Sequence, residues 1–265
     1  MAKELETRGV TPRLVYRPTA SGLASAYILC AQDRGSRTIV AHANGIAEPS
    51  ADELRCLLLP APTATASPQV AAEWIHVEGR NCEPVVCFLQ GVLNSGGGGD
   101  SGGIKVSVDL ENPRRPGVDE LARLADVLFV SSTFCRDLVG ADVGGGKRAY
   151  AARVLAALEG WIKPGASGHL LLGAAGSVCF FWRGDGGGDG SELEVVDCTA
   201  AALGIPPAEL VETVGAGDTF VAGVVWASLA GMSPPAANRL ATRLARKKCL
   251  QSGFGGLWGG SSDAM

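Results

Sequence analysis

The feature that most constrains the fold is an alternation of strand-like and helix-like segments that begins near residue 74. This alternation is typical of βαβ units, in which helices join parallel strands. We therefore predict an α/β fold with an open, mostly parallel sheet flanked by helices. The expected strands are short apolar runs at residues 74–78, 104–110, 126–131 and 169–175. The expected helices between them span residues 82–93, 117–125 and 147–159.

Two segments fall outside this alternation. The runs at 177–182 and 193–197 are too close together for a helical crossover, so we expect an antiparallel pair at one edge of the sheet. Nearer the N-terminus, two β-prone runs at 24–31 and 37–43 flank the turn residues 33–36. This pattern predicts a β-hairpin.

Composition excludes several classes of protein. The 265 residues are 46% hydrophobic, which is enough to bury a sizeable core, and the formal net charge of −4 does not favour a nucleic-acid partner. The sequence contains no run of 18 apolar residues, so it predicts no membrane span. The first ten residues are too polar for a signal peptide. The eight cysteines form no C-x-x-C pair and the three histidines are scattered, so we expect reduced thiols in a cytoplasmic protein.

Two glycine tracts, at 95–103 and 184–190, are predicted to be flexible loop insertions. The first matches G-x-G-x-x-G, but it leads into a strand rather than opening a helix, so it is not a dinucleotide fingerprint. The last predicted helix has Ser233 as N-cap and Pro234 at its first position, and it is expected to end near Gly253. Its three arginines at 239, 243 and 246 are expected to form a solvated stripe.

The stretch VETVGAGDTFVAGVVWA, residues 211–227, carries the clearest chemistry. Its two glycines allow a tight backbone turn, and the helix that follows points free N–H groups and a positive dipole end at a ligand. Asp218 lies in this opening turn, where a carboxylate could accept the proton of an attacking hydroxyl during phosphoryl transfer. On spacing alone, Asp218 could equally cap the helix.

Several motifs resemble one family in order and rough spacing from about residue 8 to the end. VETVGAGDTF resembles the second PfkB signature, with Glu212 in place of the usual aspartate. WIHVEGRN (74–81), VSVDLENPR (106–114) and ARKKCLQSGFGGL (245–257) resemble ketohexokinase stretches. The chain is thus similar to the ribokinase-like PfkB carbohydrate kinases, and its motifs are nearest to those of ketohexokinases.

The resemblance implies roles for the matched positions. It implies that Asp218 is the catalytic base and contacts the acceptor sugar, and that Arg80 contacts sugar or phosphate, although Arg80 could simply be an exposed loop arginine. It implies an anion hole formed by Gly215, Ala216 and Gly217. The implied nucleotide-binding residues are Gly173, Ala174, Gly176, Thr213, Gly215, Gly217, Cys249, Gly253 and Phe254.

The resemblance also implies ATP and Mg²⁺ as cofactors and a small sugar, with a ketohexose as first candidate, as acceptor. Residues 132–135 replace the Asn-x-x-Glu with which many relatives order Mg²⁺. We therefore expect phosphates and water to hold the ion, with Asp109 and Glu111 able to reach it through water.

The N-terminal part departs from the family. The usual first strand with its sugar-binding aspartate and the following G-G-N segment are not found in this sequence. We therefore expect an N-terminally incomplete kinase domain over 1–265, with a partial β lid at 12–45 and an α/β nucleotide-binding core at 46–265. The lid implies a possible homodimer, and sugar phosphorylation is expected to be impaired. The alternative is a non-catalytic nucleotide-binding remnant of a sugar kinase.

Overall fold

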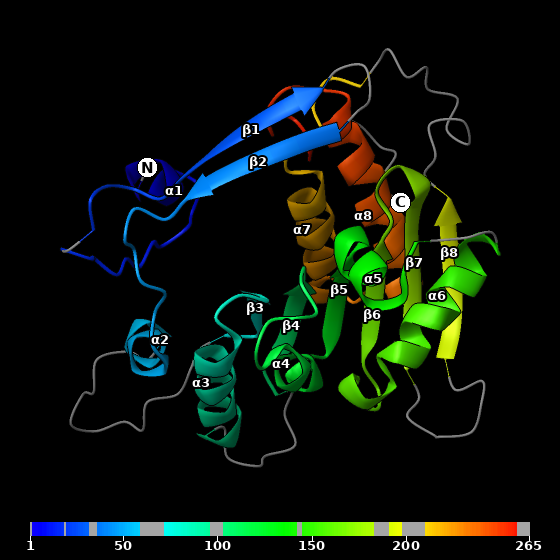
Figure 1. Cartoon of the computed structure of the whole chain (residues 1–265), viewed down its shortest axis with the longest axis horizontal. Helices are drawn as coiled ribbons and strands as arrows, with labels where there is room; N and C mark the ends of the chain where they lie inside the picture. The colour runs from blue at the N-terminus through cyan, green and yellow to red at the C-terminus, as the bar shows by residue number, and fades with distance from the viewer. Residues whose placement is uncertain are drawn as a thin grey trace. The chain divides into compact units, whose positions relative to one another are not determined.

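The computed structural model describes residues 2–18, 20–31, 36–58, 72–95, 103–141, 145–182, 191–197 and 210–258. Its helices and strands are drawn in Figure 1. The chain divides into two compact units. The first comprises Met1–Ala72 and Glu83–Gly103, and the second comprises Glu73–Cys82 and Ile104–Met265.

A six-stranded sheet forms the centre of the second unit, with the strand order β3-β4-β5-β6-β7-β8. The strands from β3 to β6 are parallel, whereas β7 is antiparallel to both of its neighbours. This topology confirms the predicted mostly parallel sheet and its antiparallel edge. The strands are β3 (Trp74–Glu78), β4 (Lys105–Leu110), β5 (Val127–Ser131), β6 (Ser167–Leu171), β7 (Gly176–Trp182) and β8 (Ser191–Asp197).

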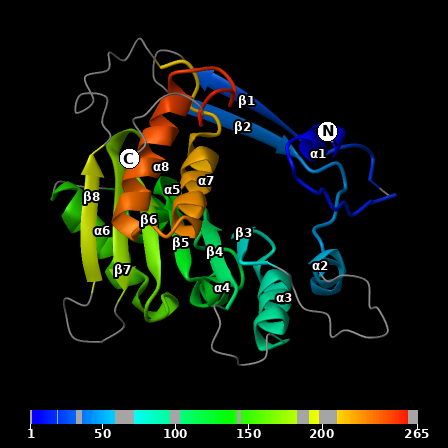
Figure 2. The same cartoon turned by 180° about the vertical axis from the view of Figure 1, so that it is seen from behind.

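Helices cover both faces of this sheet, as the two opposite views in Figures 1 and 2 show. One face carries α4 (Val118–Leu124), α5 (Ser132–Val139) and α6 (Gly146–Ala157), and the other carries α7 (Ala216–Leu229) and α8 (Pro234–Cys249). Two short 3₁₀ helices complete the unit, η1 (Glu159–Trp161) and η2 (Gly173–Ala175).

Three sequence expectations need correction here. Helix α5 was not predicted; it begins where the Ser131 hydroxyl accepts a hydrogen bond of 3.1 Å from the Phe134 N–H, and its Phe134 and Cys135 are buried. The strand expected at 169–175 runs only to Leu171, because residues 173–175 turn into η2. Helix α8 ends at Cys249 rather than near Gly253, and Ser233 holds the N-cap position without a side-chain cap hydrogen bond.

Buried polar pairs attach α8 to the sheet. His169 Nδ1 on β6 lies 2.9 Å from Asn238 Oδ1, and Ser177 Oγ on β7 lies 2.9 Å from Thr242 Oγ1. Asn238 and Thr242 are one helical turn apart, so one face of α8 carries both partners. Of the three arginines predicted to form a solvated stripe on this helix, those at 239 and 243 are exposed and the one at 246 is half-buried.

The first unit holds the predicted hairpin, in which β1 pairs antiparallel with β2 from Ser25↔His42 to Ala31↔Ser36. Six cysteines within the described ranges form no disulfide: Cys56, Cys82, Cys87, Cys135, Cys179 and Cys249. No helix within the described ranges is long and apolar enough to span a bilayer.

The elements of the first unit are α1 (Ala2–Thr7), β1 (Ser25–Ala31), β2 (Ser36–His42), α2 (Ala51–Leu58) and α3 (Cys82–Ser95). Helix α3 begins at the boundary of the second unit.

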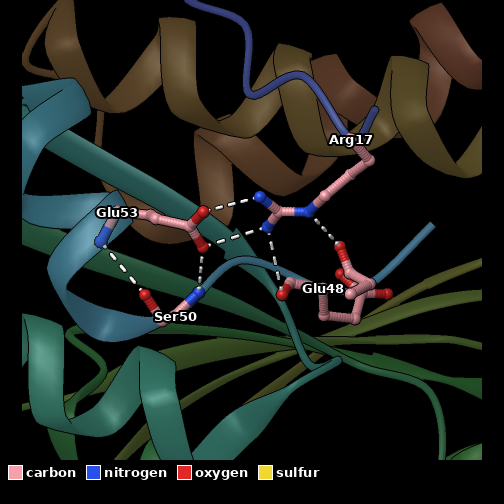
Figure 3. A network of polar contacts seen from close by, with 5 residues as sticks. Arg17, Glu48, Ser50 and Glu53 are labelled. Atoms are coloured by element: carbon pink, nitrogen blue, oxygen red, sulfur yellow. Dashed lines mark hydrogen bonds and ion pairs between the residues drawn. The ribbon is translucent and has the colours of Figure 1, made fainter. Parts of the chain in front are cut away.

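Arg17 ties the first unit together by a network shown in Figure 3. Its guanidinium donates to the Glu53 carboxylate at 3.0 Å and to the Ala47 carbonyl at 3.1 Å. Ser50 and Glu53 form a capping box at the start of α2, with the Ser50 N–H 2.8 Å from Glu53 Oε2 and the Glu53 N–H 3.2 Å from Ser50 Oγ. The hydrogen bonds from Arg17 and then Ser50 lower the pKa of Glu53 to about 2.

Some predictions concern residues that lie outside the described part of the chain. These are most of the first glycine tract (96–102), all of the second (184–190) and the hairpin turn at 33–35.

Candidate active site

The first turn of α7 forms the centre of the site. Gly215 has a φ of 79°, in the left-handed region, and Ala216 opens the helix directly after it. The Thr219 side chain braces this turn by donating a 2.8 Å hydrogen bond to the Gly215 carbonyl. Gly217 and Asp218 are exposed in the same turn. The Ala216 N–H donates to the Thr213 carbonyl at 3.3 Å. The N–H groups of Gly217 and Asp218, which follow it in the first turn, have no intrahelical acceptor, so the turn offers donors to an anion beside a carboxylate.

A second group of charges follows the carboxyl ends of β3 and β4. Arg80 Nε lies 2.8 Å from Glu78 Oε2, and Arg80 Nη2 lies 3.7 Å from Glu111 Oε2. Arg115 also pairs with Glu111, at 3.7 Å, and donates to the Gly79 carbonyl. The loop that carries Arg80 is therefore held by ion pairs on two sides, with the arginine itself exposed.

Gly79 sets the close approach of these two strand ends. Its N–H donates to the Asp109 carbonyl at 2.7 Å, and a Cβ atom at position 79 would lie only 2.5 Å from that oxygen. A glycine is therefore required for the turn that presents Arg80.

The electrostatics of Asp109 connect the two groups. Burial, followed by the charges of Glu111, Glu78 and Asp218, raises the pKa of Asp109 to about 7, against a lowering effect of Arg80. Asp218 and Asp109 are thus near enough for their charges to interact. The structure therefore brings together Asp218, Arg80 and the neighbouring Asp109 and Glu111, which come from three separate parts of the sequence.

The segment that follows α8 lies against the glycine turn. The Cys249 carbonyl accepts hydrogen bonds from the N–H groups of Val211 (2.9 Å) and Glu212 (3.2 Å). The Phe254 ring is so close to Gly215 that a Cβ atom there would lie 2.4 Å from it. Three of the predicted nucleotide-binding residues, Cys249, Gly253 and Phe254, thus belong to one segment beside the glycine turn. Burial raises the pKa of the Cys249 thiol, which does not favour a reactive thiolate.

Sequence reasoning missed the ion pair that joins these segments. Lys248 Nζ lies 2.7 Å from Glu212 Oε2, and the same oxygen accepts from the Gly253 N–H at 3.1 Å. A signal was present in the sequence: Ala237, Ala241 and Lys248 follow helical spacing, which places the lysine on the buried face of α8.

The turn at 173–176 lies at the same edge of the sheet, because it follows the carboxyl end of the parallel strand β6. Gly173 and Gly176 have φ values of 60° and 100°, and Ala174 is exposed between them. Thr213 is half-buried in the segment that leads to α7. The structure therefore places the predicted nucleotide-side residues after β6, at the start of α7 and at or after the end of α8.

A pocket of about 540 Å³ opens beside Asp218 within the second unit. One wall is the face of α7 formed by Asp218, Ala222 and Trp226, spaced four residues apart. Trp226 meets Trp258 edge to face, with ring centroids 4.3 Å apart. The pocket thus combines one carboxylate with an apolar wall. Its full lining is Asp218, Thr219, Ala222, Gly223, Trp226, Leu244, Phe254, Leu257 and Trp258.

Comparison with known proteins shows the family of this chain. The family model described as pfkB family carbohydrate kinase matches residues 1–257. The chain belongs to this family. It is 28% identical to ketohexokinase of Mus musculus over 262 residues, which cover 97% of this chain and 76% of the mouse protein. The pfkB kinases are phosphotransferases with an alcohol group as acceptor, and they use ATP.

Solved structures of pfkB-type kinases show the same fold. A ribokinase from Cryptococcus neoformans var. grubii in complex with ADP is 21% identical with a TM-score of 0.60, and the match covers 95% of this chain and 73% of that one. An adenosine kinase from Schistosoma mansoni in complex with 2-fluoroadenosine is 13% identical with a TM-score of 0.67, covering 95% and 70%. These likenesses confirm the ribokinase-like α/β fold.

The first turn of α7 in this pfkB chain has space for an anionic group such as a phosphate. The exposed first turn of α7 is open around Gly217, where a Cβ atom would meet nothing within 4 Å. Within the described ranges, no three His, Cys, Asp or Glu side chains are arranged to hold a metal ion. Carboxylates that could contact Mg²⁺ through water are present at Asp109 and Glu111.

Proposed function

We propose that this pfkB kinase transfers the γ-phosphoryl group of ATP to a hydroxyl of a small sugar, with a ketohexose as the first candidate acceptor. The observation that carries the proposal is Asp218 in the exposed first turn of α7, directly after the left-handed Gly215. A carboxylate beside the N–H groups at the start of a helix suits a reaction in which a hydroxyl loses a proton while charge develops on phosphate. The 28% identity to a ketohexokinase supports the ketohexose.

Each residue has a defined part in this proposal. Asp218 accepts the proton of the acceptor hydroxyl. The backbone N–H groups of Gly215, Ala216 and Gly217 stabilise the negative charge on the phosphoryl oxygens. Arg80 leaves its ion pairs with Glu78 and Glu111 to bind the acceptor or its phosphate, because a guanidinium exchanges carboxylate partners for phosphate readily.

The metal ion is proposed to contact protein through water. ATP brings Mg²⁺ with it, and a hard cation that keeps several waters needs only nearby carboxylates. Asp109 and Glu111 supply them at the carboxyl end of β4. The nucleotide is proposed to lie along Gly173, Ala174, Gly176 and Thr213 on one side and Cys249, Gly253 and Phe254 on the other.

A nucleoside is the second candidate acceptor. The pocket beside Asp218 has an apolar wall that includes Trp226, Trp258 and Phe254, and such a wall favours the flat ring of a base over the hydroxyls of a free sugar.

The proposal is tested by titrating the chain with ATP and Mg²⁺ in a calorimeter and then measuring ADP release with fructose, ribose or adenosine. We expect nucleotide binding and fructose-dependent ADP release. Adenosine-dependent release without a response to fructose would favour the nucleoside. Binding without any turnover would instead indicate a nucleotide-binding protein that lacks transferase activity.

The hairpin suggests a proposal about assembly. Cross-strand apolar pairs lie exposed on both of its faces, Tyr27 with Val40 and Ile28 with Ile39. A two-stranded hairpin is marginally stable in water by itself, so these pairs favour burial against a partner. We therefore propose that the lid segment, residues 12–45, joins two copies of the chain, while residues 46–265 form the nucleotide-binding core.

A further inference from the structure

Lys248 is completely buried in the last turn of α8, which is unusual for a lysine. Its ammonium has two partners from different segments. Nζ lies 2.7 Å from Glu212 Oε2, and it lies 5.2 Å from the centre of the Phe254 ring. The side chain therefore contacts the strand-like segment before α7 and the segment after α8 at the same time.

Both partners of Lys248 lie next to the glycine turn, one along the chain and one in space. Glu212 is three residues before Gly215, and its carboxylate also accepts from the Gly253 N–H at 3.1 Å. The Phe254 ring covers Gly215, because a Cβ atom added at position 215 would lie only 2.4 Å from the ring. The contacts thus run from Lys248 through Glu212 and Phe254 to the backbone that opens α7.

This ion pair is only half-buried, because Lys248 is fully buried whereas the Glu212 side chain is 36% exposed. Removing a lysine from water costs free energy that its partner only repays in good geometry, so such a pair is a poor device for stability alone. An ion pair does, however, fix the relative position of two segments, because both groups must keep their partners. That property is useful next to donors that have to be held in place for an anion.

We infer that Lys248 is a positioning residue for phosphoryl transfer: through Glu212 and Phe254 it holds residues 212–217 in the conformation that receives the terminal phosphoryl group. The inference rests on the proposed function. It assigns to Lys248 and Glu212 a task separate from the base Asp218, since neither side chain needs to touch a substrate.

The test compares two nucleotides that differ in the terminal group. In Lys248→Met an apolar side chain of similar length replaces the buried ammonium. By calorimetry with Mg²⁺, we expect the Kd of the non-hydrolysable ATP analogue AMP-PNP to rise about tenfold and that of ADP to rise less than about threefold. The reason is that only AMP-PNP carries the terminal phosphoryl group that the glycine turn holds.

Two further variants keep the test decisive. Arg243→Gln removes one positive charge from an exposed position of the same helix, and we expect both Kd values to stay as in the parent chain. Glu212→Gln keeps the hydrogen-bonding shape but removes the negative partner. It should raise the ratio of the AMP-PNP Kd to the ADP Kd, as Lys248→Met should. If Lys248→Met does not fold, Glu212→Gln tests the inference in its place.

The outcomes separate this inference from the proposed function. Equal weakening of both nucleotides in the variants, or no weakening, would show that Lys248 only stabilises the fold and would overturn the inference alone. A parent chain that binds neither nucleotide would contradict the proposed function and, with it, the role of Lys248.

Discussion

At the residue scale, Gly215 and Gly217 are only two positions apart but differ in backbone conformation and in the space around them. Gly215 has a positive φ and the Phe254 ring against it, so a side chain is excluded on two grounds. Gly217 lies inside the helix with open space around its Cβ position. The same substitution is therefore expected to have opposite effects on stability at the two sites.

We expect Gly215→Ala to lower the free energy of unfolding by about 1–3 kcal/mol, because alanine is strained at this φ and displaces the Phe254 ring. Gly217→Ala should raise it by up to about 1 kcal/mol, because alanine favours the helix. Urea denaturation of both variants measures the difference. A Gly215→Ala variant as stable as the parent chain would show that position 215 tolerates a side chain and would contradict this prediction.

Asp218→Asn tests the proposed base. The amide is nearly the same size but cannot accept the proton, so we expect kcat to fall by ~10²–10⁴. The Kd of ATP should change little, because the N–H groups of the turn remain. Steady-state kinetics and calorimetry on the same preparation measure both quantities. A kcat within about threefold of the parent, or roughly 0.7 kcal/mol, would exclude Asp218 as the base.

The attachment of α8 to the sheet is the main feature at the scale of elements. His169 is completely buried, hydrogen-bonded to Asn238, and stacked on Phe129 with ring centroids 5.6 Å apart. Burial lowers its pKa to about 4, against the raising effect of the Asn238 hydrogen bond. The ring is therefore neutral in the folded protein at neutral pH.

This burial predicts a pH dependence of stability. The ordinary pKa of histidine is near 6.5, so between about pH 6.5 and 4 the unfolded chain takes up a proton that the folded chain does not. The free energy of unfolding should consequently fall as the pH falls, by about 2 kcal/mol between pH 7 and pH 5. Urea denaturation at several pH values should show that the free energy of unfolding of His169→Gln falls less with falling pH than that of the parent chain. An equal decrease in both proteins would show that another group causes the pH dependence.

At the scale of the whole molecule, two compact units make up the chain. The second holds the six-stranded sheet and the candidate active site, and the first holds the hairpin. Because the apolar pairs on the hairpin are exposed, we propose that the first unit joins two copies of the chain.

We expect the parent chain to sediment as a dimer. The paired change Ile28→Lys with Ile39→Glu removes apolar surface from one face while opposite charges keep the strands together. Tyr27→Lys with Val40→Glu does the same on the other face and serves as the matched variant. At least one pair should give a monomer in sedimentation velocity. A monomeric parent chain, or dimers in both variants, would exclude the hairpin as the interface.

The sequence by itself determined much of the α/β fold and the centre of the site. Strand β3 lies at the predicted residues, and β4, β5 and β7 differ from the prediction by one residue at a single end. Such elements follow from local apolar patterns and turn residues, which neighbours in the chain decide. The glycine turn with Asp218 could be found for the same reason, since seven adjacent residues carry it.

Only the tertiary structure decided which distant residues meet. Lys248 and Glu212, which form an ion pair, are 36 positions apart in the chain. The charge of Asp218 helps to raise the pKa of Asp109. Trp226 contacts Trp258 beside the pocket. These contacts depend on strand register and on how α8 and its following segment pack, and no local pattern encodes either. For this reason the charges and aromatic rings around Asp218 emerged from the packing of the chain, whereas Asp218 itself was visible in the sequence.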